Sequence, residues 1–296
     1  MILTTRPLSV LTLLSSLSSR AHAALTTVTG WGDNPTRLTM AVSLPAKIAE
    51  RPAVVLALHT CGGTGQQYYQ MANYDSYAAK EGFITIYPST PNDSNCWDVA
   101  SKASLTHHGG GDSASLVRMV KYVIDKYNGD PTKVYVTGAS SGCMMTNVLM
   151  AAYPDVFAAG SCYSGVPANC LAGSPGSSPI SADQTCANGQ NIKSGDEWAA
   201  LAKAMYPGYS GKYPRMQTIH GTADYFVHYK NFGEQLKLWS TLLDVKFTRN
   251  VTDTPQRGYT KMVYGDGTQM VGISAAGVGH IVPPIPALDM AWFGLG

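Results

Sequence analysis

The chain has 296 residues, a length that suits one large α/β domain or two small ones. Hydrophobic residues make up 45% of it, which is enough for a full-sized core and excludes disordered and collagen-like chains. Charged residues make up only 14%, the formal net charge is +2 and no basic run occurs, so neither a nucleic acid nor an anionic membrane is expected as a partner.

Residues 1–23 have the layout of a secretory signal peptide. Arg6 precedes an apolar stretch at 8–17, and a small-x-small cleavage site follows at 21–23. The apolar stretch is too short to cross a bilayer, and no later stretch reaches the roughly 18 apolar residues of a transmembrane helix. The alternative, a buried N-terminal helix, lacks a helical stripe. We therefore predict a secreted protein whose mature part, 24–296, is a single domain.

Short apolar runs then alternate with longer helix-like segments. In chain order, strands are predicted at 54–58, 83–87, 134–137, 157–161, 216–219, 262–264 and 271–274, and helices near 66–80, 112–127, 141–152, 196–204 and 231–243. Asp112 or Ser113 is the expected N-cap of the helix near 112–127. Apolar strands alternating with helices indicate the α/β class: one doubly wound, mostly parallel sheet with helices on both faces.

Six cysteines follow the predicted cleavage site, an even number that fits an oxidising secretory route. None forms a CxxC pair or a Cys/His cluster with zinc-ligand spacing, so no metal is expected. We predict a fully paired framework that includes Cys61–Cys96 and Cys170–Cys186. Two sequons, at Asn92 and Asn250, are candidate N-glycosylation sites in a eukaryotic host.

The segment Gly138-Ala139-Ser140-Ser141-Gly142 is a G-x-S-x-G motif between a predicted strand and a predicted helix, the context of a nucleophile elbow. In such an elbow the chain turns so sharply that a side chain at Gly138 or Gly142 would collide with neighbouring backbone. The alternative is a glycine-rich turn in which Ser140 caps the helix. The context favours Ser140 as the nucleophile of a hydrolase.

The base is selected by elimination, because an α/β-hydrolase triad runs Ser, then Asp or Glu, then His along the chain. Four of the seven histidines precede Ser140. His220 ends a predicted strand, and His228 lies too close to the candidate acid to come from a separate loop. His280 remains, in a glycine-flanked loop after the last predicted strand, and we predict that it takes the proton of Ser140.

The acid is expected in the loop after the preceding strand of this second half. Asp224 follows the strand at 216–219 and is the preferred candidate. Asp253 and Asp266 are alternatives in polar turns, where a solvated turn aspartate is the usual explanation. In this interpretation Asp224 fixes the tautomer of His280 and stabilises the imidazolium.

An oxyanion hole requires two backbone donors, and the sequence offers a candidate for each. One is the N–H of Ser141, the residue after the nucleophile. The other comes from the loop after the strand at 54–58, where the N–H of Cys61, or alternatively of Thr60, precedes two glycines that allow close backbone approach. Without catalysis, this loop would be only a strand-to-helix turn.

Together these motifs resemble the fungal acetylxylan esterases of carbohydrate esterase family one. The resemblance covers essentially the whole mature chain and is carried by His59–Gly63, Asn95–Asp98, Gly138–Met145, Tyr163–Pro167, His220–Asp224 and Val278–His280. It implies an α/β-hydrolase fold, no cofactor and removal of O-acetyl groups from xylan outside the cell. It also implies a triad of Ser140, Asp224 and His280, with Cys61 and Ser141 at the oxyanion positions. No cellulose-binding module is seen, and we expect no anchoring to cellulose.

The acyl group leaves several hypotheses open. Acetate needs a small acyl pocket and ferulate a long aromatic slot, so a feruloyl esterase or a polyhydroxyalkanoate depolymerase with the same triad is the alternative enzyme. A hypothesis from another class is a catalytically inactive carbohydrate-binding protein on a hydrolase scaffold. Trp97, Tyr225 and Phe226 lie near motif loops and are candidate sugar contacts. The expected partner is acetylated xylan, bound by a monomer.

Overall fold

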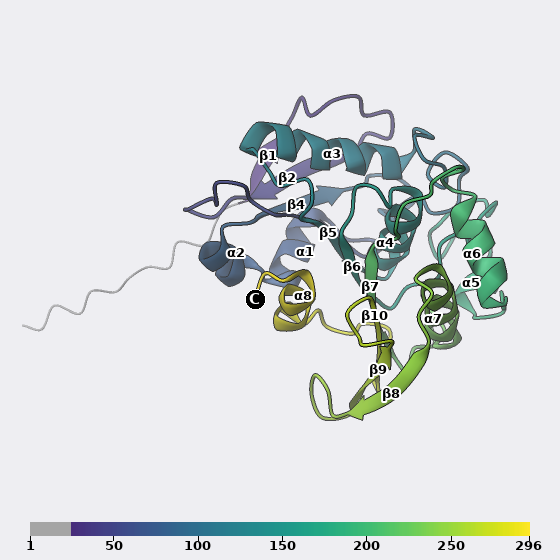
Figure 1. Cartoon of the computed structure of the whole chain (residues 1–296). Coiled ribbons are helices and arrows are strands. Elements are labelled where there is room, and N and C mark those ends of the chain that lie inside the picture. The colour runs from purple at the N-terminus through teal and green to yellow at the C-terminus, as the bar shows by residue number, and fades with distance from the viewer. Residues whose placement is uncertain (1–24) are drawn as a thin grey trace, which may run out of the picture.

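The structure, a computed structural model, describes residues 25–296 and contains a ten-stranded mixed sheet (Figure 1). The predicted signal peptide lies outside the described residues. The strands are β1 (Thr26–Val28), β2 (Thr39–Ser43), β3 (Val54–Leu58), β4 (Ile84–Ser89), β5 (Val134–Ala139), β6 (Ala159–Tyr163), β7 (Arg215–Gly221), β8 (Phe247–Thr252), β9 (Tyr259–Tyr264) and β10 (Met270–Ala275). Their spatial order is β1-β2-β4-β3-β5-β6-β7-β10-β9-β8. The strands from β4 to β10 in this order are parallel, and two antiparallel strands flank them on each side.

Helices cover both faces of the sheet. They are α1 (Gly65–Ala72), α2 (Asp75–Glu81), α3 (Asp112–Tyr127), α4 (Ser141–Ala152), α5 (Gln184–Ala187), α6 (Gly195–Lys203), α7 (Lys230–Leu242) and α8 (Pro286–Phe293). One core packs against α3, α4, α6 and α7, and the other against α1, α2 and α8 (Figure 1). Because successive side chains of a strand point to opposite faces, Val54, Leu56 and Leu58 enter the first core and Val55 and Ala57 the second. The predicted α/β architecture is confirmed.

The predicted elements are found near their expected bounds, with two corrections. The single helix predicted near 66–80 is wrong: Asn73 adopts a left-handed conformation (φ 49°) that ends α1, and α2 starts two residues later. The N-cap predicted for α3 is also wrong. Gly111 is the cap, while Asp112 lies in the first turn and its carboxylate accepts a hydrogen bond from the backbone N–H of Asp98.

Several elements were not predicted: β1, β2, β8, α5 and α8. The strand β8 has the clearest reason, since it lies at one end of the sheet and nearly all its residues are exposed. An exposed antiparallel strand lacks the continuous apolar run by which the central strands are recognised.

All six cysteines lie in the described chain, and all are paired. The predicted bonds Cys61–Cys96 and Cys170–Cys186 are confirmed, and the third joins Cys143 to Cys162. Within residues 25–296, no helix is both long and apolar enough to cross a membrane.

The parallel strands bring the motif loops to one edge of the sheet. β3, β5, β7 and β10 are all parallel to one another, so the loops that follow them emerge at their carboxyl ends on the same side. In open α/β sheets this edge is where ligands bind.

Candidate active site

Ser140 lies in a strained turn between β5 and α4. Its backbone has φ 54° and ψ −119°, and it is held by a hydrogen bond from its N–H to Tyr163 O (2.8 Å). A Cβ added at Gly138 would lie 2.4 Å from the carbonyl carbon of Gly142, and one at Gly142 would lie 2.2 Å from Leu58 O. The Ser140 side chain makes no helix-capping hydrogen bond, so the turn has the geometry of an elbow rather than of a capped helix start.

Ser140, His280 and Asp224 form one chain of hydrogen bonds. His280 Nε2 lies 2.8 Å from Ser140 Oγ, and His280 Nδ1 lies 2.8 Å from Asp224 Oδ2. A carboxylate only accepts, so Nδ1 carries the proton and Nε2 accepts from the serine hydroxyl. The Asp224 side chain is fully buried and that of His280 is 16% exposed, which leaves the imidazole at the boundary between protein and solvent.

Hydrogen bonds keep the Asp224 carboxylate ionised despite its burial. Burial alone raises its pKa, but the hydrogen bonds from His220 and His280, together with the electrostatic attraction of His280, outweigh that effect and hold the pKa well below its usual range. The backbone N–H groups of Phe226 and Val227 donate to the other oxygen, Oδ1, at 2.9 Å each. The carboxylate is therefore fixed in both orientation and charge.

His220 is part of this network, although the sequence argument only eliminated it as the base. Its Nε2–H is shared between Asp224 Oδ2 (3.0 Å) and Val227 O (2.9 Å), and the ring is fully buried. It therefore supports Asp224 through Oδ2, the same carboxylate oxygen that His280 contacts. The sequence signal that could have indicated this role is its position at the end of β7, four residues before the acid.

The alternative acids have turn roles. Asp253 Oδ1 accepts from the N–H of Gly258, and Asp266 Oδ1 accepts from the N–H and hydroxyl of Thr268. Neither carboxylate has a hydrogen bond to His280 among those of the described residues, so Asp224 is the acid that the structure places next to the imidazole.

Two unpaired backbone donors flank Ser140. Neither the N–H of Cys61 nor that of Ser141 has an acceptor within the described chain. Cys61 lines the same cavities as Ser140 and precedes Gly62, which has a left-handed φ of 71°. Two such donors beside a candidate nucleophile are suited to stabilise a negatively charged oxygen.

Two connected depressions open around Ser140. One, of about 280 Å³, is lined mainly by apolar groups, among them Met144, Leu171 and Phe226. The other, of about 350 Å³, also includes His280 and the exposed side chain of Ile180. The site is therefore an apolar groove with a serine hydroxyl at its floor.

The three predicted sugar contacts have different positions. Tyr225 (86% exposed) and Phe226 (58% exposed) lie at the rim of the groove. The prediction for Trp97 is wrong, because its ring is fully buried and packs against His59, 4.6 Å between ring centroids. A tryptophan beside a motif loop can belong to the core, and tertiary packing decides which.

Among residues 25–296, no group of three His, Cys, Asp or Glu side chains is arranged to hold a metal ion. The two sequons differ in exposure. Asn92 is half-buried and its side-chain amide donates to Thr36 O (2.7 Å), whereas Asn250 is exposed on β8.

This elbow, hydrogen-bonded triad and doubly wound sheet define an α/β-hydrolase. The chain belongs to the esterase PHB depolymerase family, whose model matches residues 38–257, and it is a carboxylic-ester hydrolase. It is 52% identical to feruloyl esterase B of Talaromyces funiculosus over 92% of this chain and 77% of that protein. It is 45% identical to acetylxylan esterase A of Aspergillus ficuum over 96% of both chains. The solved structure of an acetyl xylan esterase from Aspergillus awamori matches with a TM-score of 0.87 and 43% identity, over 92% of this chain and all of that one.

Proposed function

We propose that the protein is a secreted serine esterase that removes O-acetyl groups from xylan through an acyl-enzyme intermediate. The observation that carries the proposal is the continuous hydrogen-bond chain from Ser140 Oγ through His280 to Asp224, next to two unpaired backbone N–H groups. The fungal relatives named acetylxylan esterase A support xylan as the substrate. The disulfides and the predicted signal peptide support an extracellular location.

In this mechanism Ser140 Oγ attacks the ester carbonyl while His280 Nε2 takes its proton. The N–H groups of Cys61 and Ser141 stabilise the oxyanion of the tetrahedral intermediate. Collapse of the intermediate breaks the bond to the sugar oxygen, which receives the proton from His280. A water molecule, activated in turn by His280, then releases acetate and restores Ser140.

A feruloyl ester is the second candidate substrate. The apolar cavity beside Ser140 is larger than an acetyl group requires, and Tyr225 and Phe226 place aromatic surface at its rim. The relatives with 46–52% identity that are named feruloyl esterase B favour the same candidate. Both substrates use the same triad.

Acetate release from acetylated xylan, measured beside ferulate release from methyl ferulate, tests the proposal. We expect acetate release by the wild type, and a loss of at least about 10⁴-fold in Ser140→Ala with a nearly unchanged melting temperature. Ser164→Ala, which removes a buried hydroxyl without a hydrogen-bond partner in the described chain, is the matched control and should stay active. Ferulate release alone would reassign the acyl group, and activity in Ser140→Ala would overturn the nucleophile.

A further inference from the structure

Residues 93–97, between β4 and α3, form a turn with an unusual backbone. Its first three residues, 93–95, have φ angles of 42°, 59° and 56°, in the left-handed region that residues with a Cβ rarely occupy. Such a run persists where neighbouring structure imposes it. Here the N–H of Gly62 donates to Ser94 O (3.0 Å), and the side chain of Asn95 donates to Gly63 O (3.3 Å). The turn is thus tied to the loop that carries Cys61.

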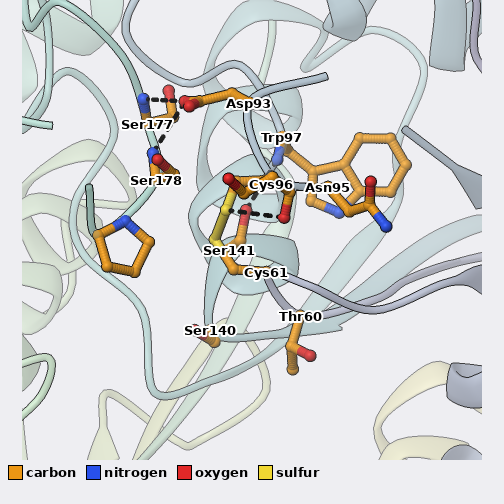
Figure 2. Close-up of a disulfide and its surroundings, with 12 residues drawn as sticks. Thr60, Cys61, Asp93, Asn95, Cys96, Trp97, Ser140, Ser141, Ser177 and Ser178 are labelled. Carbon is orange, nitrogen blue, oxygen red and sulfur yellow. Dashed lines mark hydrogen bonds between the residues drawn. A yellow bond between two sulfur atoms is a disulfide. The ribbon is translucent and has the colours of Figure 1, made fainter. Parts of the chain in front are cut away.

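The next two residues of the turn contact the side chains of Cys61 and Ser141, the two residues that carry the oxyanion donors (Figure 2). Cys96 is bonded to Cys61 through the disulfide. The backbone N–H of Trp97 donates to Ser141 Oγ (2.9 Å), and its indole N–H donates to His59 O (2.9 Å). One dipeptide therefore links the two loops whose N–H groups flank the nucleophile.

The first residue of the turn holds the wall of the cavity (Figure 2). The Asp93 carboxylate accepts from the N–H of Ser177 (2.6 Å), the N–H of Ser178 (2.9 Å) and the hydroxyl of Ser181 (2.8 Å). Ser177 and Ser178 line the apolar cavity beside Ser140. Burial opposes the ionised form of Asp93, but these hydrogen bonds outweigh it and lower the pKa of the carboxyl.

We propose that residues 93–97 are a brace that positions both donors of the oxyanion hole and the wall of the acyl cavity. The inference rests on the proposed function. Its residues are positioning residues: Trp97 and Cys96 act through the N–H groups of Cys61 and Ser141, and Asp93 acts through the cavity loop. A sub-ångström misplacement of oxyanion donors weakens the interaction that exists only in the transition state. The two arms of the brace therefore predict different kinetic defects.

The oxyanion arm is tested with Trp97→Phe, which keeps an aromatic ring but removes the indole N–H. We expect kcat to fall about tenfold with KM within twofold, because removal of a whole donor costs roughly 10²–10³-fold. Binding of a phenylboronic acid, which forms a tetrahedral adduct with the serine, should weaken in parallel. The control is Trp292→Phe, which loses an indole hydrogen bond to the Gly160 carbonyl (3.0 Å) on β6, at the level of Val136, four residues before Ser140. Equal kcat in the two variants would overturn this arm.

The disulfide gives a second test of the same arm. Replacing both Cys61 and Cys96 by Ala should lower kcat and boronate affinity together. If this variant does not fold, the comparison of Trp97→Phe with its control still decides. A folded double variant with wild-type kcat and boronate affinity would show that the covalent link positions nothing.

The cavity arm is tested with Asp93→Ala. We expect KM for methyl ferulate or another bulky acyl ester to rise several-fold, with the kcat for p-nitrophenyl acetate within twofold. Asp93→Asn, which keeps an acceptor oxygen, should recover part of the loss. The matched control is Asp183→Ala, since Asp183 lies on the same loop but caps α5 through Thr185. An identical KM in Asp93→Ala and Asp183→Ala would overturn this arm. Inactivity of the wild type on every ester would instead refute the proposed function.

Discussion

The position of Ser140 depends on two glycines, whose lack of a side chain matters as much as the hydrogen bonds made by the other residues of the site. Gly138 and Gly142 allow the backbone of β5 and α4 to approach so closely that Ser140 is driven into a left-handed φ. That strain costs free energy and is compensated by the packing of the buried elements around the elbow. Ser140 is thereby placed at the carboxyl edge of the sheet, where it lines the groove although it is only 7% exposed.

Gly142→Ala should abolish activity and lower the melting temperature sharply, because the new methyl group would overlap the Leu58 carbonyl and the strand cannot yield without disturbing the Cys61 loop. Gly233→Ala is the control: it adds a methyl group in open space on α7 and should leave the protein as stable or about 0.5–1 kcal/mol more stable. Thermal unfolding and ester hydrolysis by both variants check this. Full activity in Gly142→Ala would contradict the tight packing.

His220→Phe should lower kcat about tenfold or more, because Asp224 loses one of the donors that hold its charge and orientation. His228→Phe, a change four residues after the acid, is the control. Steady-state kinetics that leave the two variants indistinguishable would show that His220 does not support the acid.

The sequence predicted the chemically distinctive residues of the site better than their supports. Ser140, Asp224 and His280 are selected by motif and by chain order, both of which can be read from the sequence without knowledge of the packing. The supporting role of His220 was not predicted and Trp97 was wrongly assigned as a sugar contact, because both roles depend on which side chains the fold brings around them. A histidine or tryptophan next to a motif is compatible with either a contact or a support until packing is known.

At the scale of elements, the loop after β3 contains a histidine held in its neutral form. Burial lowers the pKa of His59 to about 4, although its hydrogen bond to Thr60 O acts in the opposite direction. Its other ring nitrogen accepts the N–H of Thr90 at 3.3 Å, a position that a protonated ring would no longer accept. The loop that carries Cys61 is therefore linked to Thr90, the first residue after β4, by a neutral imidazole.

The depressed pKa of His59 makes stability dependent on pH. The folded protein binds fewer protons than the unfolded chain between pH 6.5 and pH 4, so this contribution is present above that window and is lost as the pH falls through it. We expect the wild type to lose about 2 kcal/mol more than His59→Asn between pH 7 and pH 4.5. Urea unfolding at both pH values measures this difference, and equal losses would contradict it.

Elements with buried apolar runs were predictable, and those at the margins of the sheet were not. β3 and β5 are buried along their whole length, so their composition alone marks them as central strands. β1, β2 and β8 contain exposed residues, so their sequences lack the continuous apolar run that marks a central strand. The break between α1 and α2 was missed because Asn73 is not a helix breaker unless its left-handed conformation is stabilised locally.

At the scale of the whole molecule, the sheet places the candidate active site and the exposed sequon at Asn250 at different locations. The active-site loops share the carboxyl edge of the parallel strands, whereas Asn250 lies on β8, at the end of the strand order. Figure 1 shows β8 and β9 extending away from the helices that cover the central strands. A glycan at Asn250 is therefore compatible with access to Ser140.

In protein secreted by a fungal host, we expect Asn250 to carry a glycan and Asn92 to remain unmodified. The Asn250 side chain is open to solvent, whereas Asn92 is half-buried and its amide is engaged with Thr36 O. Glycopeptide mass spectrometry before and after glycosidase treatment checks both sites. A glycan found at Asn92 would contradict the structural argument.

The position of β8 has a consequence for how the protein behaves in concentrated solution. One side of β8 pairs with β9, and its other side presents backbone donors and acceptors next to exposed side chains such as Phe247. An open strand of this kind can recruit a strand from another molecule and begin aggregation. A bulky hydrated sugar at Asn250 would block that approach, so material made in a host without N-glycosylation should be fully folded yet prone to self-association.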